Sequence, residues 1–114
     1  MAQAARSFRD RVRALAQTAA IRSRAHAELN RLRYARLELL ERRGGLMGEL
    51  GEAVYAANAE ATERVREKIA RLDERVAATE AQMRELATEA EERIRQTELP
   101  VQETEIVEEI PERR

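Results

Sequence analysis

The stretch that decides the fold is residues 61–94, ATERVREKIARLDERVAATEAQMRELATEAEERI. Its apolar and small residues recur in steps of three and four, and the same pattern extends back to Met47. The mean step is 3.6 residues, the period of an undistorted α-helix. The stripe runs through Met47, Leu50, Val54, Ala57, Ala61, Val65, Ile69, Leu72, Val76, Thr79, Met83, Leu86, Ala90 and Ile94. The pattern therefore predicts a long amphipathic helix.

A second helical pattern precedes this one, with a thinner apolar stripe. It steps through Phe8, Val12, Leu15, Ala19, Ile21, Ala25, Leu29, Leu32 and Leu39, and is widened by Leu37 and Leu40. Ser7 fits a helix cap, because Asp10 follows three residues later, close to the spacing of a capping box. We expect residues 1–6 to fray.

The composition favours long helices over a globular enzyme. Of the 114 residues, 73 are Ala, Glu, Lys, Leu or Arg, whereas only three are aromatic. Such an excess is typical of coiled coils and long helices, and so few large apolar side chains would give a compact domain too thin a core. We therefore predict an all-α fold, a long antiparallel helical hairpin that resembles a coiled coil.

Charge is segregated along the chain. Residues 1–43 carry a net charge of +7, residues 44–97 carry −4, and residues 98–114 carry −4. The basic part could bind an anionic partner, or it could fold back on the acidic part. We favour the fold-back, because no interleaved aromatic residues or glycine-rich binding loop accompany the arginines. A third arrangement is a single continuous helix that pairs in parallel with a second copy. Charge disfavours it, because the basic part would then lie beside its own copy.

The position of the turn has two candidates. All four glycines lie within residues 44–51, and Gly44-Gly45 could break the helix. If the helix instead continues there, Gly44, Gly48 and Gly51 would let a partner backbone approach closely. The other candidate is residues 56–60, where Asn58 could act as a left-handed C-cap or as the N-cap of the next helix.

Residues 98–114 differ in character from the rest. Pro100 should end the helix at or before Leu99, and the following sequence is acidic and β-branched. We predict a disordered acidic tail over 98–114, which is either solubilising or a short binding motif anchored by Ile106, Val107 and Ile110.

The element Leu50-Gly51-Glu52-Ala53-Val54-Tyr55, followed by a second amphipathic helix, resembles a group of small bacterial helical-hairpin proteins. The resemblance covers about residues 15–97. It implies a hairpin whose turn follows the Tyr, at residues 56–60. Many members of that group carry a C-terminal zinc ribbon, but this chain has no cysteine, so metal binding is not implied here.

Candidate chemical groups are sparse. His26 is the only histidine, and no second ligand stands three or four residues from it. Carboxylates at helical spacing (Glu60, Glu63, Glu67; Glu85, Glu89, Glu92) are interspersed with Arg, as on a solvated helix face. We therefore expect no enzyme activity, no metal, no cofactor and no small-molecule substrate. The N-terminus lacks the apolar core of a secretory signal, and a cytoplasmic protein is expected.

The sequence thus predicts a non-enzymatic module that acts through helix–helix association, as a homodimer or with a partner helix. The predicted interface comprises Leu29, Leu32, Leu40, Met47, Leu50, Val54, Val65, Ile69, Leu72, Val76, Met83, Leu86 and Ile94. The alternative is binding to a membrane surface through Phe8, Val12 and Leu15 with the surrounding Arg6, Arg9, Arg11 and Arg13. Nucleic-acid binding through the same arginines is less favoured, because no aromatic residues are interleaved with them.

Overall fold

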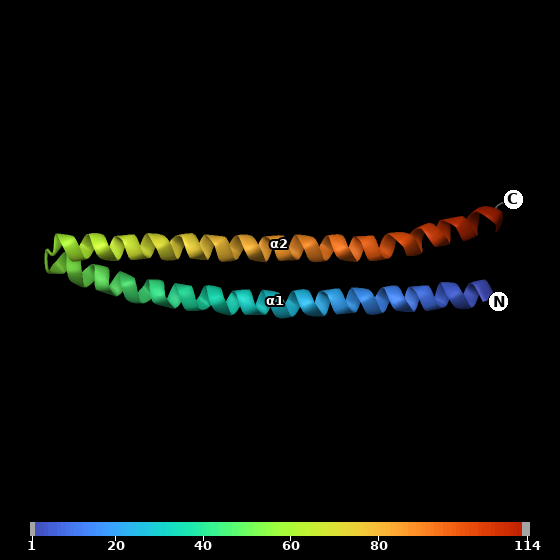
Figure 1. The fold of residues 1–114 in the computed structure, drawn as a ribbon, viewed down its shortest axis with the longest axis horizontal. Helices are drawn as coiled ribbons and strands as arrows, with labels where there is room; N and C mark the ends of the chain where they lie inside the picture. The colour runs from blue at the N-terminus through green and yellow to red at the C-terminus, as the bar shows by residue number, and fades with distance from the viewer. Residues whose placement is uncertain (1, 113–114) are drawn as a thin grey trace. The chain divides into compact units, whose positions relative to one another are not determined.

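The computed structural model consists of two helices joined by a short turn (Figure 1). Helix α1 spans Ala2–Tyr55 and helix α2 spans Ala59–Glu112, and each has 54 residues. The structure describes the backbone of residues 2–112 and the side chains of residues 4–98, and no strand occurs in this part of the chain. The predicted all-α helical hairpin is confirmed.

The paired helices divide into two compact units, each of which has one segment from α1 and one from α2. Unit 1 contains residues 1–28 and 86–114, and unit 2 contains residues 29–85 with the turn. The described buried apolar side chains all lie in unit 2, and they are Leu39, Ala53, Val65, Ile69 and Leu72. Among the residues of unit 1 whose side chains are described, Thr18 is buried. The site described below lies entirely in unit 2.

The face of α1 that packs in unit 2 follows a seven-residue repeat. Leu32, Leu39, Leu46 and Ala53 are seven residues apart, and each is buried or half-buried. We call these four residues, together with Leu29 and Leu50, the inner seam. Opposite them α2 contributes Val65, Ile69 and Leu72, three or four residues apart. Burying a large aliphatic side chain stabilises a fold by about 1.5–3 kcal/mol, so each of the buried leucine, valine and isoleucine side chains stabilises the hairpin.

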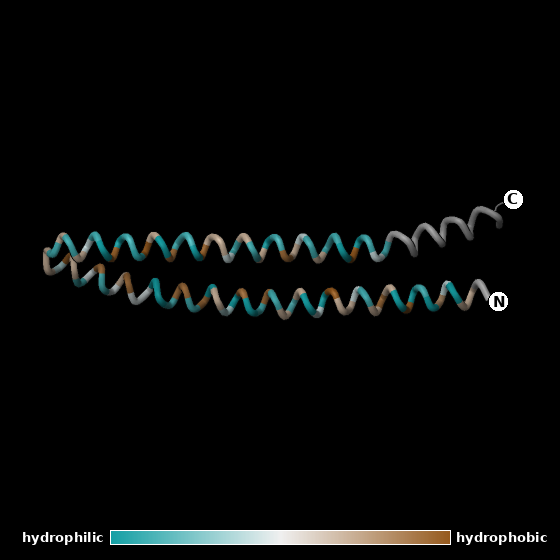
Figure 2. Tube along the Cα trace, viewed as in Figure 1, coloured by the Kyte–Doolittle hydropathy of each residue, from teal (hydrophilic) through white to brown (hydrophobic). Residues whose placement is uncertain are grey.

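The core is thin. Among the described residues, none of the large side chains is completely buried, because two helices alone cannot enclose a side chain on all sides. Figure 2 shows apolar positions alternating with hydrophilic ones along both helices rather than forming one apolar block. The hairpin therefore depends on narrow seams, as the composition predicts.

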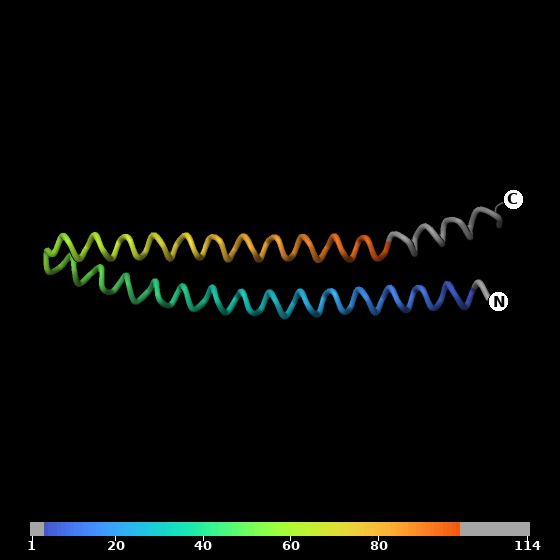
Figure 3. The backbone as a smooth tube through the Cα atoms, in the orientation of Figure 1, coloured from blue at the N-terminus to red at the C-terminus, as the bar shows by residue number. Residues whose placement is uncertain are grey.

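The turn lies at residues 56–58 (Figure 3). Ala57 has a positive φ of 53°, and its N–H donates to the Val54 carbonyl while the Asn58 N–H donates to the Ala53 carbonyl, both at 3.0 Å. This pair of bonds is the Schellman arrangement, which satisfies the last carbonyls of a helix.

Asn58 also begins α2. Its Oδ1 accepts a hydrogen bond of 3.1 Å from the Ala61 N–H, which is the geometry of a helix N-cap. The carbonyl of Asn58 accepts further bonds from the N–H and hydroxyl of Thr62. One residue thus closes the first helix and caps the second, while Ala57 takes the left-handed position.

The helices extend beyond two expected ends. α1 begins at Ala2, so Ser7 lies inside the helix and is not its cap, because the preceding residues are good helix formers. α2 includes Pro100, where the sequence predicted the end because proline lacks an N–H and costs about 3 kcal/mol inside a helix. The side chains of residues 99–114 lie outside the described part, so the disordered tail and its motif at Ile106, Val107 and Ile110 stay predictions.

Candidate helix-docking surface

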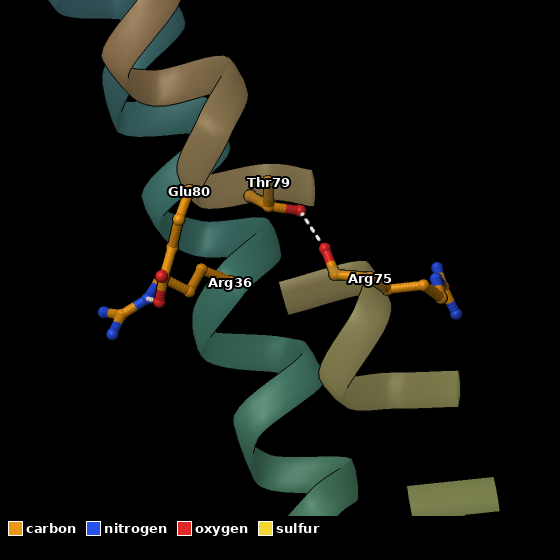
Figure 4. Close-up of polar contacts among 4 residues, drawn as sticks. All are labelled: Arg36, Arg75, Thr79 and Glu80. Carbon is orange, nitrogen blue, oxygen red and sulfur yellow. Dashed lines mark hydrogen bonds and ion pairs between the residues drawn. The ribbon is translucent and has the colours of Figure 1, made fainter. Parts of the chain in front are cut away.

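Two ion pairs fix the register of the hairpin in unit 2. Arg36 Nε donates to Glu80 Oε1 at 3.0 Å (Figure 4), and Arg43 Nε donates to Asp73 Oδ1 at 2.7 Å. The two arginines are seven residues apart, as are the two acids, so both pairs report the same antiparallel register. Exposed pairs of this kind contribute about 0.2–1 kcal/mol each. Their main effect is therefore to specify which residues face each other.

Both ion pairs take the base from α1 and the acid from α2. Arg36 and Arg43 stand where the spacing of the inner seam would place further apolar residues. Their guanidinium groups are turned across to α2, where they meet acids. Sequence reasoning did not assign these arginines to the interface, although the charge segregation predicted that basic and acidic segments would lie together.

Within α2, the polar residue Thr79 also lies on the inner face. Its hydroxyl donates to the Arg75 carbonyl at 2.9 Å, one turn earlier (Figure 4). Because the hydroxyl of Thr79 is hydrogen-bonded within its own helix, Thr79 can face α1 without leaving a polar group unsatisfied. Thr79 therefore fits a position that otherwise takes aliphatic residues.

The predicted interface residues of α2 lie on its inner face. Val65, Ile69 and Leu72 are buried, whereas Val76, Met83, Leu86 and Ile94 are half-buried, the last two in unit 1. On α1, the predicted residues Leu29, Leu32 and Leu50 are half-buried and belong to the inner seam.

Three predicted interface residues of α1 lie elsewhere. Leu40, Met47 and Val54 are exposed, with 37%, 46% and 55% of their surface accessible. The inner seam instead uses the residue immediately before each of them, namely Leu39, Leu46 and Ala53. Because successive residues lie about 100° apart around a helix, the prediction merged two separate apolar faces of α1. The repeat of Leu32, Leu39 and Leu46 is the sequence signal that distinguishes them.

The second face of α1 forms a continuous row of apolar and small residues, which we call the outer seam. It consists of Leu37, Leu40, Gly44, Met47, Gly51 and Val54, in steps of three, four, three, four and three. All six are exposed in unit 2. A strict alternation of three and four is the repeat of a coiled-coil contact, and nothing in the described part of the hairpin covers this one.

In the described part of the chain, the exposed large apolar residues lie on one helix. Among the described residues, every large hydrophobic side chain that is exposed belongs to α1: Phe8, Val12, Leu15, Tyr34, Leu37, Leu40, Met47, Val54 and Tyr55. The large apolar residues of α2 whose side chains are described, from Val65 to Ile94, are buried or half-buried. Within residues 4–98, α1 therefore has large apolar side chains that α2 leaves exposed, whereas those of α2 are at least half-buried.

The glycines of α1 are not required by the hairpin. Each of the four has ordinary helical backbone without a positive φ, and a Cβ added to any of them would meet nothing within 4 Å. A glycine inside a helix costs about 1 kcal/mol relative to alanine. The four glycines at residues 44–51 therefore destabilise α1, and packing within the hairpin does not explain why they are glycine.

Open grooves flank the inner seam, and one of them is basic. It is lined by Arg42, Gly45, Leu46, Glu49, Lys68, Arg71, Leu72 and Arg75. Two of its cations already have acidic partners one turn away, because Arg42 bonds to Glu38 at 3.1 Å and Arg71 lies 3.7 Å from Glu67. Because these two cations are already paired, the groove is a poor site for binding an anion.

The described residues show few features of a chemical site. They contain no group of three or more His, Asp or Glu side chains that could hold a metal ion. His26 is exposed on unit 1. Within the described range, neither helix has a stretch long and apolar enough to cross a membrane.

In comparisons with known proteins, no family model matches this chain, and neither does any curated protein or any solved structure.

Proposed function

We propose that this protein is a helix-association module, which binds another helix through the outer seam of α1. The observation that carries the proposal is the outer seam itself, in which exposed large apolar residues and two exposed glycines of α1 follow one another in steps of three and four. A single exposed leucine would need no explanation. A row of apolar and small residues in coiled-coil spacing matches the way helices recognise helices.

The proposed role needs no catalytic group. The resemblance of residues 50–55 to bacterial helical-hairpin proteins supports the architecture and adds no activity to it. The ion pairs and the Schellman turn supply a hairpin with a fixed register. Such a scaffold presents the outer seam on a preformed helix, which lowers the entropy cost of binding.

The test is the accessibility of the outer seam in the native host, and the absence of cysteine from the chain makes it direct. A single cysteine is placed at the seam (Met47→Cys) or at an exposed position of α2 (Ala77→Cys), and each thiol is alkylated in cells with a maleimide. We expect the seam thiol to react about tenfold more slowly than the control thiol in cells, and both to react at equal rates in urea. Equal rates in cells would contradict the proposal.

A second candidate function is supported by unit 1. Phe8, Val12 and Leu15 are exposed there, at steps of four and three, and arginines surround them in the sequence. Such a face can lie in the headgroup region of an anionic bilayer. Co-sedimentation with anionic and neutral vesicles tests this role. The full chain should pellet with anionic vesicles only, and Phe8→Glu with Leu15→Glu should abolish the pelleting. Pelleting that both substitutions leave unchanged would contradict it.

A further inference from the structure

The outer seam has an arrangement of large and small residues that suits a particular partner. Its six positions read Leu, Leu, Gly, Met, Gly and Val. A helix packed against it must meet large side chains at some levels and glycines at others. Helices of constant separation need a large residue opposite each small one, so the partner should present the reverse order of sizes.

The chain's own outer seam presents that order when it runs in the opposite direction. In an antiparallel pair centred between Gly45 and Leu46, Leu40 faces Gly51 and Met47 faces Gly44, and the two ends are closed by Leu37 against Val54. Each glycine thus receives a large side chain from the other copy. This accounts for two glycines that the hairpin itself does not need, since a Cβ there would meet nothing within it.

A parallel pair in register would pack less evenly. Leucine would face leucine and glycine would face glycine, so contact would be lost at each glycine level. The sizes therefore favour the antiparallel orientation.

The charges beside the outer seam agree with this orientation. In the antiparallel pair, Arg36 is level with Tyr55, Glu41 with Leu50, and Arg43 with Gly48. No two like charges stand at the same level anywhere in residues 36–55. In the parallel pair, every charge would be level with its own copy, which is unfavourable. Arg36 and Arg43 also keep their heads on Glu80 and Asp73, so they leave the seam itself uncharged.

We propose that the partner of the outer seam is a second copy of this chain, with α1 packed antiparallel on α1 and the two-fold axis between Gly45 and Leu46. The proposal rests on the proposed function, in that it takes the outer seam as the docking surface. It adds the identity, orientation and register of the partner. The pairing is isologous, so the same patch serves both copies and the assembly closes as a dimer.

Disulfide trapping tests orientation and register, because a disulfide requires Cβ atoms about 3.5–4.5 Å apart. Cysteine is placed at one end of the seam in one sample (Leu37→Cys) and at the other end in a second, mass-tagged sample (Val54→Cys). After mixing and mild oxidation, we expect the mixed disulfide to form at least about tenfold faster than either like-with-like disulfide. Ala77→Cys, exposed on α2, gives the rate of random collision.

Two results would overturn the proposal. Trapping of Leu37→Cys mainly with itself would indicate a parallel pair. Rates no greater than those of Ala77→Cys would indicate that the copies do not pair through this face. Both variants change exposed side chains, and circular dichroism checks that the helices are retained.

Sedimentation equilibrium of the purified full chain gives an independent measurement. We expect a dimer at tens of micromolar, and at least about a tenfold weaker dimer when acids replace two seam residues (Leu40→Glu with Met47→Glu). The matched control places the same charges at the same spacing on α2 (Ala70→Glu with Ala77→Glu) and should leave the dimer unchanged.

Filling the glycine levels (Gly44→Leu with Gly51→Leu) should also weaken the dimer about tenfold, although it strengthens the helix. This opposite response separates a packing role in the dimer from a role in the hairpin. A monomeric natural chain, or a dimer that all these variants leave intact, would overturn self-pairing. If the thiol at residue 47 is still protected in cells, the proposed function stands with a different partner helix.

Discussion

Ala57 holds the most demanding backbone conformation in the described chain. Among residues 2–112 it is the one residue with a positive φ, and a side chain with a Cβ adopts that region at a cost of about 1–2 kcal/mol. The neighbouring bonds from Asn58 to Ala53 and from Ala57 to Val54 hold it there. The turn thus carries local strain that the caps on both sides offset.

Replacing Ala57 by glycine should therefore stabilise the protein. We expect Ala57→Gly to raise the free energy of unfolding by about 1 kcal/mol, because glycine takes positive φ without a Cβ clash. Urea denaturation followed by circular dichroism measures the change. Ala56→Gly is the control, since Ala56 has no positive φ, and it should not stabilise. A loss of stability in Ala57→Gly would contradict the strain at this turn.

The side chain of Asn58 should contribute to the stability of the hairpin, because its oxygen caps α2. Asn58→Ala removes the acceptor of the Ala61 N–H, and loss of an N-cap costs about 0.5–2 kcal/mol. Asn58→Asp keeps the acceptor and should lose much less. The comparison is made by the same urea denaturation, and equal losses in the two variants would show that the side-chain oxygen is not the stabilising group.

At the scale of one element, α1 carries two apolar faces with distinct tasks. Leu39 is 6% exposed, whereas its neighbour Leu40 is 37% exposed. We expect Leu39→Ala to lower the unfolding free energy of the hairpin by about 2–3 kcal/mol, as for a buried leucine, and Leu40→Ala to lower it by less than about 1 kcal/mol.

These two variants are best compared at a protein concentration low enough to dissociate any dimer, because association would add to the stability of the natural chain. Both variants remove the same atoms from adjacent positions of one helix, so helix propensity cancels. Equal losses would mean that the two faces are not distinct.

The same contrast explains what could be predicted from the sequence. The face of α2 was identifiable because one apolar stripe, from Val65 to Met83, stands among charged residues. On α1, Leu39 and Leu40 are both leucine, so periodicity alone could not separate the inner seam from the outer one. Only contact with α2 distinguishes them. Spacing leaves two places for the turn, and the resemblance of residues 50–55 favours the one at 56–60. The hydrogen bonds that end α1 and begin α2 at Asn58 are not specified by spacing.

At the scale of the whole molecule, the net charge changes sign along the chain. The basic segment of residues 1–43 and the acidic segment of residues 44–97 meet in unit 2 through Arg36 with Glu80 and Arg43 with Asp73. An exposed pair contributes little, but like charges placed opposite each other are unfavourable. The segregation of charge therefore stabilises the observed register only slightly. Its larger effect is to destabilise other alignments of α1 and α2, in which like charges would lie opposite each other.

Exchanging the members of one pair tests this effect. Arg43→Asp alone should lower the unfolding free energy by about 1 kcal/mol, and adding Asp73→Arg should recover most of the loss, because the coupling of exposed pairs is about 0.2–1 kcal/mol. The recovery should diminish in 1 M salt, where screening is stronger. A full double-mutant cycle by urea denaturation measures the coupling. No recovery in the exchanged variant would contradict the register.

The turn also has a consequence for the order in which the chain folds. The partners of the two ion pairs are separated by 30 and 44 residues along the chain, so contacts farther from the turn close longer loops. Once the turn has formed, however, each further contact between α1 and α2 closes only a few more residues, so the additional entropy cost of loop closure is small. Unit 2 should therefore form progressively outward from Asn58.

Asn58→Ala should then slow folding, whereas Leu32→Ala, far from the turn, should mainly speed unfolding. Stopped-flow mixing would measure both rates, and the chain would form its first contacts at the point where it reverses direction.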